Sequence, residues 1–323
     1  MLVEVTDRLA PAVVTEVGLL LAAALAADGV RPVSEESELR LAHGGPAGGA
    51  DVTVRDPAGA LVGYARLERP AEDPDAEAEL VVAPSARRRG VGTALIGRLE
   101  ELAGSRPLRV WAHGELPGSA ELARSRGYER ARVLLQMRRP LDGVDPDPHP
   151  RLPAGVTVST FRPGTDEDAW LHVNARAFAA HPEQGRWTTE DLALREAEAW
   201  FDPAGFFLAW REVSPDASPD AGPDDVTAGR RLLGSHWTKV HPAGEAGDAP
   251  VGEVYVLGID PDAQGTGLGR ALTDLGLAHL RGQGLSHVLL YVEEDNTAAV
   301  ALYERSGFTR YLVDVSWRST TSH

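Results

Sequence analysis

Cysteine is absent from this chain of 323 residues. Its absence excludes disulfide bonds, a thiol nucleophile and cysteine-ligated metal centres. Lysine is nearly absent as well, because Lys239 is the single lysine among 32 basic residues. One explanation is a coding bias toward arginine, with this lysine retained by chance. The other is that the position requires a compact ammonium group and not a planar guanidinium.

Positive charge is scarce, since 32 basic residues face 48 acidic ones and leave a net charge of −16. A surplus of negative charge repels phosphate backbones, so we expect no nucleic-acid partner. Long apolar runs are missing too. The longest candidate, residues 17–27, is short, and acidic residues precede it where a signal peptide carries positive charge. We therefore expect a helix of a folded domain there, and a cytoplasmic monomer with no membrane partner.

Proline divides the chain into two halves. Residues 139–153 are dense in proline and show no apolar periodicity, which is typical of an extended linker. We predict an N-terminal domain over residues 1–140, a linker over 141–154 and a C-terminal domain over 155–323. A second stretch rich in Pro, Asp, Ala and Gly, residues 214–229, lies between two apolar runs and is predicted to be a long hairpin loop without a catalytic role.

The two halves repeat one another. Three residues of the first half recur 177 residues later in the second: Pro84 as Pro261, Gly90 as Gly267 and Gly92 as Gly269. A long period of this kind indicates the duplication of a whole domain. In the second half, apolar patterns predict helices over residues 167–180, 190–200, from the glycine loop to about 282, and 297–306, with strands over 206–210, 232–237, 252–259, 287–292 and 311–317. This alternation predicts a mixed α/β sheet flanked by helices, built twice.

A glycine-rich loop, Gln264-Gly-Thr-Gly-Leu-Gly-Arg270, lies between a predicted strand and a predicted helix, and residues 87–92 occupy the same place in the first half. Glycine lets the backbone approach a ligand closely, and a helix N-terminus offers unpaired N–H groups to a pyrophosphate. The loop has neither the Gly-Lys-Ser/Thr ending of a Walker A motif nor the spacing of a dinucleotide-binding fingerprint. Two copies favour a ligand-binding loop over a plain tight turn.

This pattern resembles the Q/R-x-x-G-x-G/A signature of the GNAT acetyltransferases, and the predicted helix with Tyr303, followed by a Gly-Phe pair, is similar to the last motif of that family. The resemblance implies acetyl-CoA as cosubstrate, with no metal. It also implies that the pyrophosphate is held by the glycine loop and that pantetheine lies along a splayed strand, residues 257–259. Free N–H groups of such a strand can pair with the pantetheine amides and polarise the thioester carbonyl.

Acetyl transfer to an amine needs a base for the ammonium proton and benefits from an acid for the departing thiolate. We predict Glu253, near the start of the cofactor strand, as the base, acting directly or through a water, and Tyr303 as the acid. The alternatives are a solvated strand-end charge and a packing residue. Without cysteine, direct attack with no acyl-enzyme is expected. Ala76 and Ala123 stand opposite these two residues in the first half, which is therefore predicted to be catalytically silent.

Residues 28–35, 181–187, 236–242, 252–261 and 290–296 resemble those of the mycothiol synthases, tandem GNAT enzymes of actinobacteria. The resemblance implies acetylation of the cysteinyl amine of Cys-GlcN-inositol, the last step of mycothiol synthesis. It implies that a polar pseudo-disaccharide, a small-molecule substrate, is contacted by five residues: Glu35, Glu183, Lys239, Glu253 and Tyr291. Glu36 is an alternative to its neighbour in the first of these roles.

The same resemblance implies two acetyl-CoA sites. In the second half the implied contacts are Leu257, Gly258, Ile259, Gln264, Gly265, Thr266, Gly267, Leu268, Gly269, Arg270, Asn296, Thr297, Ala298, Ala299, Val300 and Ala301. In the first half they are Leu80, Val81, Val82, Arg88, Arg89, Gly90, Val91, Gly92 and Thr93. Two other functions stay open: a GNAT enzyme that acetylates another small amine or a peptide N-terminus, and a noncatalytic module that binds acetyl-CoA.

Overall fold

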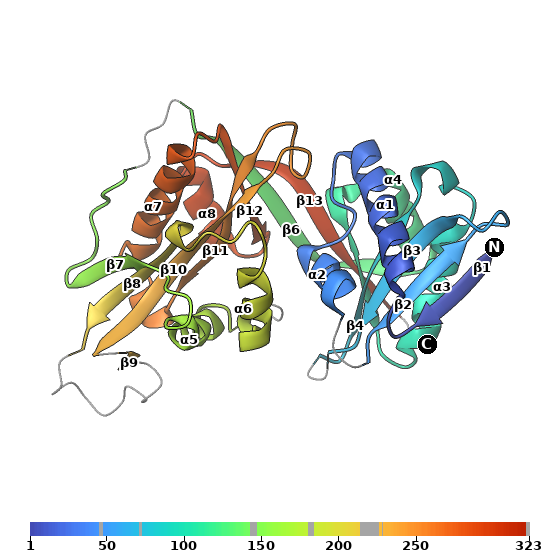
Figure 1. Cartoon of the computed structure of the whole chain (residues 1–323), viewed down its shortest axis with the longest axis horizontal. Helices are drawn as coiled ribbons and strands as arrows, with labels where there is room; N and C mark the ends of the chain where they lie inside the picture. Colours follow the sequence, from blue (N-terminus) through green and yellow to red (C-terminus); the bar gives the residue numbers. More distant parts are fainter. Residues whose placement is uncertain are drawn as a thin grey trace. The chain divides into compact units, whose positions relative to one another are not determined.

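A computed structural model of the chain describes residues 1–44, 48–70, 73–142, 147–179, 184–213, 226–227 and 229–320. Contacts between residues divide the chain into two compact units. Unit 1 comprises Met1–Gln136, Val292–Val300 and Arg310–His323, and unit 2 comprises Met137–Tyr291 and Ala301–Thr309. Both units are mixed α/β sheets with helices packed on them (Figure 1).

The sheet of unit 1 has the strand order β1 (Leu2–Thr6), β2 (Ala50–Arg55), β3 (Leu61–Glu68), β4 (Ala76–Val82), β5 (Leu108–Ala112) and β13 (Thr309–Ser319). Its strands pair antiparallel, except that β4 and β5 are parallel. Parallel neighbours need a crossover, and α3 (Val91–Ala103) supplies it. The short helices η1 (Pro84–Ala86) and η2 (His113–Glu115) follow β4 and β5.

Helices cover both faces of this sheet. α1 (Pro11–Asp28) packs Val17 and Leu21 in one apolar cluster with Tyr64, and α2 (Glu35–His43) follows it. A second cluster joins Leu95 and Leu99 of α3 to the strands, with α4 (Pro117–Ser125) beside it. β6 (Tyr128–Pro140) follows α4 and neighbours β13 in the strand order.

α1 is longer and more apolar than the sequence alone suggested. With 18 residues and a mean hydropathy of 1.6, it meets the length and composition of a membrane-spanning helix. The expectation that no apolar run reaches that length is therefore wrong for α1. Its buried residues are nevertheless Val17, Leu20, Leu21 and Ala24, spaced to form one stripe that packs within unit 1. Only 17% of the helix is buried, so α1 packs on unit 1 along this one stripe, as a helix of a folded domain.

The sheet of unit 2 runs in the order β6, β12 (His287–Glu293), β11 (Val251–Ile259), β10 (Arg230–His241), β8 (Phe206–Glu212) and β7 (Val156–Thr160), with the short β9 (Val226–Thr227) paired to β10. The helices are α5 (Glu167–Ala177), α6 (Thr189–Glu196), α7 (Leu268–Gly282) and α8 (Thr297–Arg305), and the short helices are η3 (Gln184–Arg186), η4 (Pro203–Gly205) and η6 (Pro261–Ala263). The expected mixed α/β fold is confirmed.

Alternation along β8 explains how this sheet is covered on both sides. Phe206, Leu208 and Trp210 point to one face and join the cluster that contains α5 and α6. Ala209 points to the other face and joins the cluster that contains α7. Successive side chains of a strand point to opposite faces, and a continuous apolar run such as Phe206–Trp210 is typical of a strand buried on both, so each face carries its own helical layer.

Most predicted elements exist, but several bounds differ. The helix expected over residues 190–200 starts at a capping box of Thr188 and Asp191 and ends at Glu196. The helix expected over 167–180 ends at Ala177. β10 extends to His241, four residues past the expected end, because it pairs with β11 along that length. Residues 214–225 and 228 of the expected hairpin loop, and 143–146 of the expected linker, lie outside the described residues.

The last strand of each half by sequence reaches the unit of the other half: nearly all of β13 lies in unit 1, and β6 begins in unit 1 and ends in unit 2. β13, from the C-terminal end of the chain, pairs antiparallel with β5 in unit 1, with Val315 opposite Ala112. β6, from the first half, neighbours β12, and the Leu141 N–H that follows β6 donates to the Ser286 carbonyl over 2.8 Å. Each unit is thus built from both halves of the sequence.

Candidate active site

The two glycine loops have the same backbone conformation. Gly267 precedes α7 with φ 89° and ψ −2°, and Gly90 precedes α3 with φ 83° and ψ 0°. Both torsions are left-handed, the region that glycine enters without strain. Each loop thereby turns the first N–H groups of its helix outward at the helix N-terminus, as expected for an anion site.

Side chains fix both loops in the same way. The Gln264 amide donates to the carbonyl of Ile259 over 3.4 Å, and the Arg87 guanidinium donates to the carbonyl of Val82 over 3.3 Å. Arg87 is also held by two hydrogen bonds to Asp28, of 2.7 and 2.6 Å. Sequence reasoning missed the role of Asp28, although it lies in the segment that resembles the mycothiol synthases. The equivalent hydrogen bonds support duplication beyond the glycine pattern itself.

The strands that precede the two loops separate from their parallel neighbours. β11 pairs with β12 from Gly252 to Val254 but continues to Ile259. β4 pairs with β5 from Ala76 to Glu79 but continues to Val82. In both units the unpaired end of the strand is the segment that the sequence predicts to lie along pantetheine. Each opening leaves strand N–H groups on that side available to a ligand.

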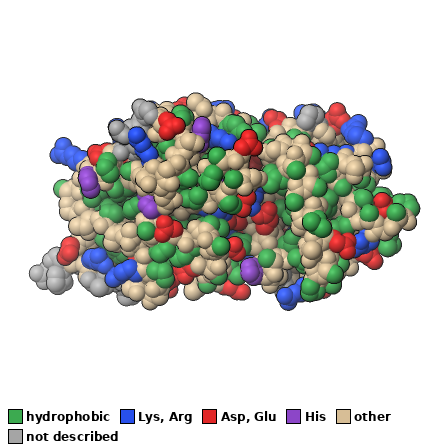
Figure 2. Space-filling view, turned by 45° about the horizontal axis from the view of Figure 1, so that its top comes forward, with side chains coloured by type: hydrophobic (Ala, Val, Ile, Leu, Met, Phe, Trp, Pro, Cys, Tyr) green, Lys and Arg blue, Asp and Glu red, His purple; other side chains and the backbone are tan. Residues whose placement is uncertain are grey.

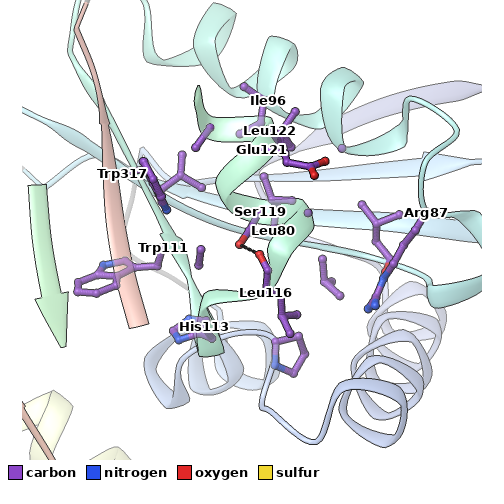
Figure 3. A pocket seen from close by; sticks show the side chains of 18 of the residues that line it. Leu80, Arg87, Ile96, Trp111, His113, Leu116, Ser119, Glu121, Leu122 and Trp317 are labelled. Atoms are coloured by element: carbon purple, nitrogen blue, oxygen red, sulfur yellow. Dashed lines mark hydrogen bonds between the residues drawn. The ribbon is translucent and has the colours of Figure 1, made fainter. Parts of the chain in front are cut away.

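The opening in unit 1 leads into a cavity of about 700 Å³ (Figure 3). Leu80, Val81 and Val82 of β4 line it together with the start of α3 and residues of α4. In Figure 3, Ile96 and Leu122 lie toward one end, and Trp111 and His113 toward the other. Of the contacts implied for the first half, seven line this cavity: Leu80, Val81, Val82, Arg88, Gly90, Gly92 and Thr93.

A buried ionic cluster forms one wall of this cavity. His113 hydrogen-bonds Glu79 through Nε2 over 2.8 Å and Asp314 of β13 through Nδ1 over 3.0 Å. Burial lowers the pKa of His113, but the two carboxylates outweigh burial and raise it to about 10. The pKa of Glu79 is lowered although burial raises it, because His113 and the Ser34 N–H hydrogen-bond its ionised form. Sequence reasoning did not find this cluster.

In unit 2, Glu253 lies on β11 directly opposite Lys239 of β10. Both are buried, at 6% and 4% exposure, and Glu253 Oε2 accepts a hydrogen bond from His241 Nε2 over 2.6 Å. The register between the two strands shifts at Trp237 and Thr238, so that Tyr255 is the extra residue of a β-bulge. A bulge bends its strand and redirects the side chains beside it. The structure thus places Glu253 and Lys239, two predicted site residues, next to each other. It also places His241 beside Glu253, whereas the sequence had only indicated that His241 lies in a segment that resembles the mycothiol synthases.

Aromatic rings surround Lys239. Its Nζ lies 4.3 Å from the centre of the Trp200 ring and 5.3 Å from that of Tyr255. Arg195 donates to the Tyr255 hydroxyl over 2.8 Å and lies 3.8 Å above the Trp187 ring. Such cation–π contacts hold both cations in place in a partly buried setting. Aromatic rings and the two cations that they hold thus lie in the same part of unit 2 as the buried carboxylate of Glu253.

Tyr303 lies on α8 and is 8% exposed. Its ring meets Phe308 edge-on, with 5.8 Å between the ring centres. Burial raises the pKa of Tyr303 to about 12, because a phenolate would be poorly solvated there. The hydroxyl therefore keeps its proton at neutral pH and can donate it.

The remaining candidate residues are placed as follows. Glu35 is the first residue of α2, in unit 1, and Tyr291 is a 40% exposed residue of β12. Asn296 accepts a hydrogen bond from the Ala299 N–H at the start of α8, and contacts assign Asn296–Val300 to unit 1. Glu183 lies outside the described residues. Among the residues that the structure describes, no group of three His, Asp or Glu side chains is arranged to hold a metal ion.

Acidic and basic side chains are interspersed on the face of the molecule seen in Figure 2. The blue side chains of Lys and Arg do not gather there into a broad patch. This distribution agrees with the net charge of −16.

Known proteins match the chain along most of its length. The model of the acetyltransferase (GNAT) family matches residues 24–128 and 170–308. A mycothiol acetyltransferase of Geodermatophilus obscurus is 72% identical over 98% of this chain and 97% of its own. A mycothiol acetyltransferase of Thermobispora bispora is 52% identical over 98% of this chain and its whole length.

Solved structures match both units. A tandem GNAT protein from the clavulanic acid biosynthesis pathway has a TM-score of 0.69 at 25% identity, covering 98% of each chain. A GCN5-related N-acetyltransferase from Sphaerobacter thermophilus has a TM-score of 0.66 at 26% identity, covering 98% of this chain and 95% of its own. The duplication predicted from the glycine loops therefore corresponds to a known tandem architecture.

Proposed function

Because the chain belongs to the GNAT acetyltransferase family, in the group of the mycothiol acetyltransferases, we propose that it transfers the acetyl group of acetyl-CoA to the cysteinyl amine of Cys-GlcN-inositol. The products are mycothiol and CoA. The observation that carries this proposal is the 72% identity to a mycothiol acetyltransferase across both units. Glu253, beside the splayed strand β11, supplies a chemical group that such a reaction needs.

Each chemical requirement has a residue in unit 2. Glu253 takes a proton from the substrate ammonium, which makes the amine nucleophilic. The backbone N–H groups of residues 257–259 stabilise the negative charge that develops on the thioester oxygen. Tyr303 donates its proton to the departing CoA thiolate, and the raised pKa keeps that proton available at neutral pH. Holding amine and thioester together contributes much of the rate.

The acceptor is a polar pseudo-disaccharide, and we assign Lys239, Glu35, Glu183 and Tyr291 to its recognition beside Glu253. Many hydroxyl groups call for fixed hydrogen-bonding partners. Lys239 suits this role because the rings of Trp200 and Tyr255 hold its ammonium group, so that little side-chain entropy remains to be lost on binding. The acidic residues suit a cationic amine.

Acetyl-CoA is the donor, and the glycine loop at residues 264–270 together with residues 296–301 is assigned to bind it. The cavity of unit 1 is assigned to a second molecule, held by residues 80–82 and 88–93. Unit 1 lacks the counterpart of Tyr303, since Ala123 lines the cavity at the corresponding position. The second molecule would therefore be bound without being consumed. We also propose a cytoplasmic monomer with no nucleic-acid or membrane partner, in keeping with the acidic composition.

Matched glycine variants test the two donor sites. In Gly90→Ala and Gly267→Ala, a Cβ atom meets a left-handed backbone and the path of the pyrophosphate, so each should weaken one site by about tenfold or more. Calorimetry should find two acetyl-CoA molecules per wild-type chain and one per variant. Only Gly267→Ala should lose turnover. One molecule per wild-type chain, still bound in Gly90→Ala, would contradict the assignment to unit 1.

An acceptor panel tests the function itself. Release of CoA thiol is measured with acetyl-CoA and, in turn, Cys-GlcN-inositol, simple cysteine conjugates, a peptide N-terminus and an aminoglycoside. We expect kcat/KM for Cys-GlcN-inositol to exceed the others by at least about 10²-fold, because partners built for its hydroxyls stay unpaired with smaller amines. Turnover of other amines alone would discard the assigned substrate and keep the GNAT chemistry. CoA release with no acceptor consumed would favour the noncatalytic module.

A further inference from the structure

We propose that His241 is a positioning residue for the acetyl transfer, a fixed cation that orients Glu253 and pairs with its buried carboxylate. The inference rests on the proposed function, because it takes Glu253 as the base. It adds a residue that is neither in the glycine loop nor among the five predicted substrate contacts.

The geometry places His241 between two carboxylates. His241 is the last residue of β10, and its neighbour two positions back, Lys239, is the residue directly opposite Glu253. His241 Nε2 lies 2.6 Å from Glu253 Oε2, and Nδ1 lies 3.3 Å from Glu245 Oε2. The side chains of His241 and Glu253 are 5% and 8% exposed, whereas Glu245 is 39% exposed. The imidazole thus connects a buried carboxylate to one that reaches solvent.

Charges on every side of the ring decide its protonation. Burial lowers the pKa of His241, while hydrogen bonds to Glu245 and Glu253 raise it and the nearby Lys239 lowers it. The carboxylates prevail, and the pKa of His241 lies above its ordinary value. Both ring nitrogens of an imidazolium are donors, which matches the two acceptor oxygens. A neutral imidazole could donate to only one of them.

The hydrogen bond between His241 and Glu253 offsets an unfavourable effect of burying a carboxylate. A carboxylate removed from water favours its protonated form, and a protonated Glu253 could not accept a proton from the substrate ammonium. The cation at His241 favours the ionised form and occupies Oε2, while no hydrogen bond to Oε1 is found among the described residues. Oε1 is therefore the basic atom. The ammonium becomes an amine, the carboxylate becomes a carboxylic acid, and that proton leaves from Oε1 to water before the next turnover. His241 already carries both of its protons, so it cannot take the substrate proton on from Glu253. Its role is to position Glu253.

The test is the pH dependence of kcat/KM for Cys-GlcN-inositol in His241→Gln, with Glu245→Gln as the matched comparison. Gln at 241 keeps an N–H donor and removes the charge. We expect the acid limb of His241→Gln to move to higher pH by about one unit, a roughly tenfold loss on that limb, with activity recovering at alkaline pH. The KM for acetyl-CoA should not change. Glu245→Gln should move the limb by less, because Glu245 is exposed and well screened.

Two outcomes would overturn the proposal. One is a wild-type acid limb in His241→Gln, and the other is a uniform loss at all pH values, which would indicate a structural role alone. Nuclear magnetic resonance of histidine-labelled wild-type protein gives a readout that needs no turnover. His241 should lose its proton above pH 6.5 in the wild type and at lower pH in Glu253→Gln. If His241 titrates at or below the ordinary pKa of histidine, the proposal is contradicted. If His241 titrates as expected but Cys-GlcN-inositol is not acetylated, only the proposed substrate is rejected.

Discussion

Glu253→Gln should lower kcat/KM for the acceptor by about 10²- to 10⁴-fold, the range typical of a lost general base. Glutamine has nearly the same shape and can still meet His241 through its amide, so the loss would be chemical and not steric. Acetyl-CoA affinity should stay within about twofold, because the glycine loop is untouched. Steady-state kinetics and calorimetry on the same preparations measure both quantities.

Tyr303→Phe is the matched comparison for this variant. It removes only the hydroxyl and keeps the ring contact with Phe308. A thiol has an ordinary pKa of about 8.5, so the thiolate leaves tolerably well without an acid, and we expect only about a tenfold loss of kcat. Equal losses in both variants would argue against separate roles as base and acid. Full activity in Glu253→Gln would remove Glu253 as the base.

His113→Leu should lower the free energy of unfolding by about 3–5 kcal/mol, the cost of breaking a buried ionic cluster from one side. Glu79 and Asp314 are each 6% exposed, so water scarcely reaches them, and both would lose the cation between them. Denaturant unfolding measures the change. The exposed His149 gives a control, since His149→Ala should change stability by less than about 0.5 kcal/mol.

The pH dependence of this stability difference has a definite sign. The pKa of His113 is raised in the folded protein, so its contribution is complete below pH 6.5 and is lost as pH rises through about 10. The pKa of Glu79 is lowered, so its contribution is present above pH 4.5 and is lost as pH falls through the folded value. The wild type should therefore exceed His113→Leu most between about pH 5 and 6.5. A difference that grows toward pH 11 would contradict the charged cluster.

The sequence was sufficient for features that are local along the chain. The glycine loops, the alternating strands and the duplication all depend on neighbours in sequence, and Gly90 and Gly267 indeed share one backbone conformation. The cluster around His113 was not predictable, because His113 of η2 and Asp314 of β13 are 201 residues apart in the sequence. The contact of His241 with Glu253 depends on the register of β10 against β11, which no single-strand pattern sets.

The placement of β13 in unit 1 has a consequence for how such a chain can change over time. A duplicated gene ordinarily leaves two copies that can be lost or separated one at a time. Here, deleting the second half would remove β13 and leave β5 as an open edge in the first sheet, with the buried His113 short of one carboxylate. Deleting the first half would in turn remove β6, which neighbours β12, so a first half that is silent as predicted would still be needed for assembly.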